Sequence, residues 1–255
     1  MTDLHLFLNA LRELVRPAKL AAAILLAGLG VLLAVLARAS ADAGTFDPQA
    51  TFNAISSVLI FGYMVTILSL VLATGLIGQE VEAKTIPYLL TRPVPRWRIL
   101  LAKYAAAVVV TTLAVWFADT AIALTLFPIT KIGTSHLWKD LLILPVAVMT
   151  YSGVFMLLGS LFKRALLIGL GYAVLEPLLP YLPGDFKLVS LLTYLHVLAP
   201  HLNDADSAIV TQAAPDTAVA SWVAWTVISA VIGASVVLAL SVFSVREYTP
   251  LEDRA

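Results

Sequence analysis

Two acidic residues, Asp119 and Glu176, stand inside long apolar runs of this 255-residue sequence. If these runs cross a membrane, each central carboxylate costs roughly 2.5–3.5 kcal/mol on insertion scales, and such residues usually face a bundle interior or a cavity. Both lie toward the same end of their runs, so they could share a depth. One interpretation is a polar path or a proton-linked pair. The other, which we favour, is that each is a protonated or hydrogen-bonded structural residue.

A second group of polar residues follows the fifth apolar run and comprises His196, His201, Asp204 and Asp206. Imidazole and carboxylate groups are ligands for zinc and other divalent metals. Their spacings of five, three and two residues fit no single helical face, and Pro200 interrupts them. We therefore predict a solvated loop and no metal site.

The sequence offers little for an enzyme. It has no cysteine, no G-x-S-x-G or H-E-x-x-H motif and no G-x-x-x-x-G-K-[ST] phosphate loop. An intramembrane hydrolase needs an embedded nucleophile and base or a metal cluster. The histidines lie near a terminus or outside the apolar runs, at His5, His136, His196 and His201. We predict no catalytic residues, and no ATP hydrolysis by this chain alone.

The most structured polar stretch is 79–98, between the second and third apolar runs. Thr85 can cap a short helix with Pro87 at its second position, and Pro93 and Pro95 would stop that helix. Apolar residues between charged flanks are typical of a rigid element presented to a partner. The alternative is a basic loop that only reflects membrane topology.

Composition identifies the setting for these groups. Apolar residues make up 60% of the chain and charged residues 13%, with a mean hydropathy of +0.94. A soluble domain has roughly 25% charged residues, and a soluble fold of this length could not cover so much apolar surface. A soluble or disordered protein is excluded, and the bilayer is the expected solvent.

A spanning helix needs about 20 mostly apolar residues. The sequence predicts an all-α membrane protein with six transmembrane helices in a single transmembrane domain, 1–255. The fifth predicted helix is the shortest, and it ends in a proline-rich stretch. The predicted spans are 18–37, 53–78, 99–127, 141–162, 165–182 and 218–243.

An amphipathic segment precedes the first span. Apolar residues at helical spacing line one face of 3–16, and Pro17 follows it. We predict an interfacial helix within 1–17, with packing on protein as the alternative. Ala39-Ser40-Ala41 resembles a signal-cleavage site, but the region before the run is long and carries acidic residues, so we expect no cleavage.

The formal charge is zero, with 16 Lys and Arg against 16 Asp and Glu, but the distribution is uneven. With the N-terminus inside, six spans place twelve basic residues inside and four outside, which predicts cytoplasmic termini. The longest outer loop, 183–217, includes an apolar stretch at 188–198 that is too short to cross and is predicted to be an interfacial or re-entrant helix. The four outer basic residues are Arg38, Lys131, Lys139 and Lys187.

The loop and the layout resemble ABC-type export permeases, the membrane subunits with the type V exporter fold. In that family an acidic pair precedes a Gly-Thr, a Leu-Leu, a Pro-x-x-Arg and a Lys at the start of the third span. Lys84 replaces the usual glycine, and Pro95 replaces a small polar residue. The matching residues are Glu80, Glu82, Thr85, Leu89, Leu90, Pro93, Arg96 and Lys103.

The resemblance implies a multi-pass subunit of a bacterial or archaeal inner membrane that binds no cofactor itself, with ATP and Mg on a partner ATPase. It implies two copies of that ATP-binding subunit, a second permease chain in a homodimer, and contact with the lipid bilayer. No feature points to nucleic acid. The ATPase-coupling loop would use Glu80, Glu82, Thr85, Arg92 and Arg96.

We therefore predict the permease subunit of an ATP-driven exporter. The apolar outer segment is compatible with lipid-like or drug-like cargo, or with delivery of force to a periplasmic partner. The alternatives are a stand-alone ion-coupled secondary transporter and, less favoured, an intramembrane enzyme. Co-purification of an ATPase of separate sequence distinguishes them.

Overall fold

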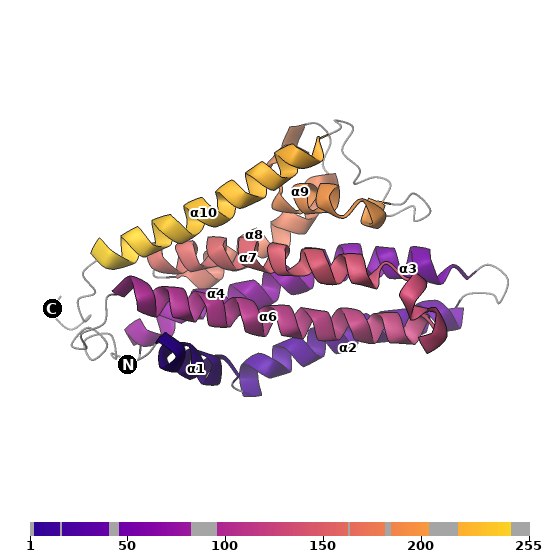
Figure 1. The fold of residues 1–255 in the computed structure, drawn as a ribbon, viewed down its shortest axis with the longest axis horizontal. Helices are drawn as coiled ribbons and strands as arrows, with labels where there is room; N and C mark the ends of the chain where they lie inside the picture. Colours follow the sequence, from indigo (N-terminus) through magenta and orange to yellow (C-terminus); the bar gives the residue numbers. More distant parts are fainter. Residues whose placement is uncertain are drawn as a thin grey trace.

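The computed structural model describes residues 3–15, 17–40, 46–82, 96–162, 164–181, 185–203 and 219–245. Every regular element within them is helical (Figure 1), as the sequence predicts. The elements are α1 (Asp3–Leu14), α2 (Pro17–Ser40), α3 (Pro48–Ile55), η1 (Ser56–Met64), α4 (Val65–Glu82), α6 (Arg96–Leu126), η2 (Ile129–Thr134), α7 (Leu137–Leu161), α8 (Ala165–Leu175), η3 (Glu176–Tyr181), η4 (Asp185–Val189), α9 (Leu191–Leu198), η5 (Pro200–Asn203) and α10 (Ser221–Val245).

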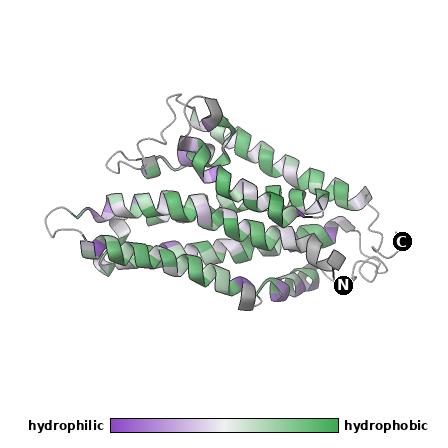
Figure 2. Cartoon of the chain, turned by 180° about the vertical axis from the view of Figure 1, so that it is seen from behind, coloured by the Kyte–Doolittle hydropathy of each residue, from purple (hydrophilic) through white to green (hydrophobic). Residues whose placement is uncertain are grey.

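Five helices in the described residues are long and apolar enough to cross a membrane. Figure 2 shows the hydrophobic colour along most of the length of the long helices, with hydrophilic residues in α1 and near helix ends. Their bounds fall within a few residues of five of the predicted spans. They are Lys19–Ser40, Pro48–Gly75, Trp97–Leu126, Leu137–Leu161 and Ser221–Ser244.

Helix α1 packs on protein as well as presenting an apolar surface. Ala10 and Leu14 are buried, and α1 contacts α6. Leu8 and Val15 remain exposed. The apolar face predicted for 3–16 is therefore only partly buried. The side of α1 that contacts α6 is centred on Ala10 and Leu14, which leaves Leu8 outside the contact. Pro17 begins α2, where its fixed backbone angle and missing N–H suit the first helical position.

The second span is one long helix made of α3, η1 and α4, and it is the most buried of the five. Asp47 caps it, since its carboxylate accepts a hydrogen bond of 2.8 Å from the Gln49 N–H. Pro48 occupies the first position. The middle segment, η1, is π-helical, a distortion that often occurs at functional sites.

The central helices α4, α6 and α7 pack together, with α2 against α6 and α10 against α7. Figure 1 shows α2 and α10 on opposite sides of this centre, with α10 inclined to it. Both α2 and α10 are mostly exposed, as expected for helices that face lipid or another chain.

The fifth predicted span is shorter than expected as an α-helix. Helix α8 ends at Leu175 and continues as the 3₁₀ segment η3. Pro177 and Pro180 each lack the N–H that an α-helix would use, which accounts for the change. The predicted apolar helix of the outer segment 183–217 is present as α9, over Leu191–Leu198.

The bundle has two distinct ends. Helix α1 and the last turn of α10 lie at one end, which we call the α1 end (Figure 1). At the opposite end, called the α3 end, α2 and α6 finish and α3 and α7 begin. Arg38 links two helices there, since its Nη1 donates a 2.7 Å hydrogen bond to the Thr125 carbonyl.

Candidate functional site

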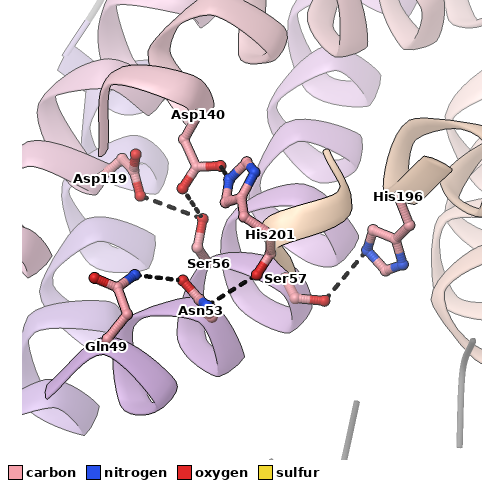
Figure 3. Close-up of polar contacts among 8 residues, drawn as sticks. All are labelled: Gln49, Asn53, Ser56, Ser57, Asp119, Asp140, His196 and His201. Carbon is pink, nitrogen blue, oxygen red and sulfur yellow. Dashed lines mark hydrogen bonds and ion pairs between the residues drawn. The ribbon is translucent and has the colours of Figure 1, made fainter. Parts of the chain in front are cut away.

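A buried polar network lies at the α3 end, among side chains of α3, η1, α6, α7 and η5 (Figure 3). Its centre is the Ser56 hydroxyl, which is 3.0 Å from Asp140 Oδ2 and 3.4 Å from Asp119 Oδ1. Asp119, Asp140 and Ser56 have no exposed surface. Ser56 is the first residue of the π-helical segment.

The same network fastens η5 to the bundle. His201 Nε2 is 2.7 Å from Asp140 Oδ1, and the His201 carbonyl accepts a 2.8 Å hydrogen bond from Asn53 Nδ2. The Asn53 side chain is oriented by Gln49, whose Nε2 donates to Asn53 Oδ1 at 2.8 Å. One residue of η5 is thus joined to both α3 and α7. We call these two contacts of His201 the η5 latch.

Helix α9 has its own contact with η1. His196 Nε2 lies 3.2 Å from the Ser57 hydroxyl, and both side chains are buried. Burial lowers the pKa of His196 to about 4, because desolvation disfavours the charged ring. His196 is therefore neutral at pH 7.

Glu176 belongs to a different set of contacts. Its Oε1 accepts hydrogen bonds from the Tyr151 hydroxyl at 3.0 Å and the Ser190 hydroxyl at 3.1 Å. The same oxygen accepts one from the Leu192 N–H at 2.9 Å, in the first turn of α9. A carboxylate suits this place because the N–H groups of a helix start are otherwise unpaired. Glu176 thereby joins α8, α7 and α9.

The two acids singled out from the sequence are both fully buried, but they have different partners. The structure brings Asp119 together with Asp140 through Ser56, and Glu176 together with Tyr151 and Ser190. Whether either acid lies on a transport path stays a prediction.

Sequence reasoning missed Asp140 and the polar residues of α3 and η1. A signal for the second group was present: Gln49, Asn53, Ser56 and Ser57 follow one another at helical spacing in an otherwise apolar run. Asp140 gave no such signal, because it stands at the boundary between a loop and a span.

The two histidines of the segment 183–217 have separate partners, His201 with Asp140 and His196 with Ser57. Asp204 and Asp206 lie outside the described residues. In the described part of the chain, no three His, Cys, Asp or Glu residues gather closely enough to hold a metal ion.

The predicted coupling loop is only partly described. Glu80 and Glu82 lie in the last turn of α4, and Arg96 is the first residue of α6. Thr85 and Arg92 lie outside the described residues.

The resemblance also included a lysine at the start of the third span, and that residue has a clear contact. Lys103 Nζ on α6 is 3.5 Å from Glu13 Oε2 on α1. The lysine is largely buried and the glutamate partly so. This ion pair ties α1 to α6 near the α1 end.

Long apolar helices around a buried polar network define a multi-pass membrane protein. Residues 15–176, well over half of the chain, match the model of the ABC-2 family transporter proteins, and the chain belongs to this family. It is the membrane-spanning permease subunit of an ABC transporter, a non-catalytic component whose ATPase is a separate partner subunit. No curated protein matches the sequence.

Proposed function

We propose that the chain is a six-span export permease with both termini in the cytoplasm. The fifth span is α8 continued by η3. Eleven residues of α-helix and six of 3₁₀-helix extend about 28 Å together, close to the roughly 30 Å of a bilayer core. The apolar character of Ala165–Pro180 supports this assignment.

The coupling site is the loop 79–98, which connects α4 to α6 and which the partner ATPase contacts. Glu80, Glu82, Thr85, Arg92 and Arg96 make the contact or brace the loop. Supporting this role, α4 ends at Glu82 and α6 begins at Arg96, so any displacement of the loop acts directly on two central helices.

Helix α1 moves with this site. The Lys103–Glu13 ion pair and the buried side chains Ala10 and Leu14 join α1 to α6. Movement of the start of α6 is therefore transmitted to α1 through direct protein contacts. The assembly consists of two permease chains, as a homodimer, and two ATP-binding subunits.

The observation that carries this proposal is the family match over residues 15–176. Purification of the tagged chain in mild detergent tests it. We expect an ATPase of separate sequence to co-purify, with about one ATPase per permease. A permease that brings down no ATPase, with flux driven by an ion gradient, would instead indicate a secondary transporter.

The coupling role is tested with the double variant Glu80→Ala/Arg96→Ala. Each charge-assisted contact is worth about 1.5 kcal/mol or more, so the loss of two should weaken binding of the ATPase on the order of a hundredfold or more. Transport should be uncoupled from ATP hydrolysis while the protein stays in the membrane. Lys139→Ala, an exposed cation at the α3 end, is the matched control and should retain the ATPase. Equal retention by both variants would contradict the coupling role.

A further inference from the structure

The Ser56 hydroxyl lies between two carboxyl groups, and its single hydrogen limits which of these groups can be ionised. A serine hydroxyl has one hydrogen to donate, while an ionised carboxylate can only accept. Ser56 is within reach of Asp140 Oδ2 and Asp119 Oδ1. It cannot donate to both. If both contacts are hydrogen bonds, one carboxyl must be protonated and donate to the Ser56 oxygen.

The surroundings of the two acids differ, and they favour the charged form of Asp140. Its Oδ1 faces His201 Nε2 at 2.7 Å, a distance typical of charge-assisted hydrogen bonds. Its Oδ2 faces Ser56 at the shorter of the two distances. Asp140 also lies in the first turn of α7, where the helix dipole stabilises a negative charge.

Asp119 has none of these stabilising contacts. Its Oδ2 is buried with no hydrogen-bond partner among the described residues, and its Oδ1 has only the longer contact to Ser56. A buried carboxylate without donors is strongly unfavourable, whereas a neutral carboxylic acid is much less so.

We propose that Asp119 is a buried proton-binding site that controls the η5 latch. The Asp119 carboxyl holds a proton on Oδ1 and donates it to Ser56, Ser56 donates to Asp140, and Asp140 accepts a second hydrogen bond from His201. The ligand of the site is a single proton. The site lies at the α3 end, where α6 finishes, whereas the proposed coupling loop leads into the start of α6, so the two are tested independently (Figure 1).

Loss of this proton would change the latch. Ionised Asp119 would face Asp140 across one hydroxyl, and the two anions would compete for its single hydrogen. The repulsion displaces the Asp140 carboxylate from its place beside Ser56, and with it the Oδ1 atom that His201 Nε2 contacts at 2.7 Å. Deprotonation of Asp119 therefore weakens the contact between η5 and α7 and favours release of η5 from the α3 end.

None of the other ionisable groups that the structure describes near the site forms a hydrogen bond or an ion pair with Asp119, so the assignment of the proton to Asp119 stands. The His136 ring is 5.0 Å from that of His201, and Arg38 is directed to the Thr125 carbonyl. Lys131 and Lys139 are exposed on η2 and α7. On α9 and before α3, the groups are His196, buried against Ser57, and Asp47, which caps α3.

Infrared spectroscopy of the full chain in lipid nanodiscs tests the proton directly. At pH 7 we expect a carbonyl-stretch component of a protonated carboxylic acid that is absent from Asp119→Asn. In Ser56→Ala the component should remain and shift to higher frequency, because the acid loses its hydrogen-bond acceptor. Glu176→Gln, which alters the other buried acid, should leave the Asp119 component unchanged.

The outcome that overturns the assignment is equally specific. Suppose that Asp119→Asn melts like the wild type and that its spectrum shows every protonated-acid component of the wild-type spectrum. Asp119 is then ionised in the wild type, and the proposal is wrong. If Asp119→Asn does not fold, Ser56→Ala decides: an unshifted spectrum contradicts the proposal, and a shifted component supports it.

The link to the latch has its own test, helped by the absence of cysteine from the chain. Leu202, in η5, is fully buried, so Leu202→Cys reports opening of η5 through its rate of maleimide labelling. Raising the pH should accelerate labelling several-fold more in this variant than in Leu202→Cys/Asp119→Asn, which corrects for ionisation of the thiol. Equal acceleration in both would show that Asp119 does not control the latch.

Discussion

At the scale of single residues, one oxygen atom organises the junction of three helices. Glu176 Oε1 accepts hydrogen bonds from Tyr151, Ser190 and the Leu192 N–H, all of them buried. Each donor would otherwise lack a partner in an apolar environment, where water cannot replace the carboxylate. Leaving one buried polar group unpaired costs about 1–3 kcal/mol.

Glu176→Ala should therefore destabilise the protein by about 3 kcal/mol or more. The measurement is the midpoint of thermal unfolding in detergent. Glu176→Gln is the matched control, since it retains one acceptor oxygen and should lower the midpoint much less. Equal midpoints for Glu176→Ala and the wild type would mean that the three donors find other partners.

Transport measurements distinguish a structural role of the buried acids Asp119 and Glu176 from a role in the path that the cargo follows. Asp119→Asn and Glu176→Gln keep the size and the hydrogen-bonding capacity of each side chain while removing its ability to bind and release a proton. On the structural interpretation, which we favour, both retain wild-type flux of the identified cargo. A loss of flux in a variant that melts normally would place that acid on the transport path.

His196 gives a pH dependence with a definite sign. Its pKa is about 4 in the folded protein and about 6.5 in an unfolded chain, so the unfolded state binds more protons between these values. Stability should fall as pH decreases from about 6.5 to 4, by about 3 kcal/mol at most. Comparison of unfolding midpoints for the wild type and His196→Gln across this range isolates the contribution. Parallel pH profiles would contradict it.

At the scale of elements, Pro145 breaks the hydrogen-bonding pattern inside α7, and a neighbouring helix repairs it. Proline has no N–H to donate to the carbonyl four residues earlier, which belongs to Leu141. That carbonyl accepts instead from the Trp116 indole N–H of α6 at 3.0 Å. Unpaired backbone groups are unfavourable in lipid, so this contact joins α6 to α7.

A double-mutant cycle measures that repair. Trp116→Phe should destabilise the protein by about 0.6 kcal/mol, the average for hydrogen bonds within a membrane helix bundle, and by no more than about 1.7 kcal/mol, the largest value. In a Pro145→Ala background the same substitution should cost much less, because residue 145 can then donate to Leu141 itself. Equal costs in the two backgrounds would show that the indole does not act through this carbonyl.

Close packing of α4 and α7 depends on Gly159. A Cβ at this position would lie 3.2 Å from the Thr74 carbonyl oxygen, which is backbone and cannot rotate away. Gly159→Val should therefore destabilise the protein by about 1–3 kcal/mol. Gly233→Val on α10, where a Cβ meets nothing within 4 Å, is the control and should have little effect on the unfolding midpoint.

The elements also show what the sequence reveals and what it hides. The bounds of α2, α6, α7 and α10 follow from hydropathy, because lipid requires about 20 apolar residues in each spanning helix. The shortness of α8 is indicated by the prolines that follow it, Pro177 and Pro180. The π-helical turn at Ser56 had no recognisable pattern. A single sequence also cannot bring together residues 56, 119, 140 and 201, since their proximity arises only from packing.

At the scale of the whole molecule, the uneven distribution of charge predicts which end faces the cytoplasm. The α3 end and the segment beyond α8 carry Arg38, Lys131, Lys139 and Lys187, while the other twelve basic residues belong to the α1 side on the six-span arrangement. The α3 end should therefore face outward, which places the proton site near the outer surface and the coupling loop at the inner one.

Cysteine labelling in intact cells tests this orientation without background, because the chain contains no cysteine. Lys131→Cys in η2 and Arg98→Cys at the start of α6 replace exposed basic residues at opposite ends. A membrane-impermeant maleimide should label Lys131→Cys directly and Arg98→Cys only after permeabilisation, because a spanning bundle separates the two positions by the thickness of the membrane. The reverse pattern would invert the topology and would move the ATPase contact away from residues 79–98. If both variants were labelled without permeabilisation, the two positions would lie on the same side of the membrane, and α6 would not cross it.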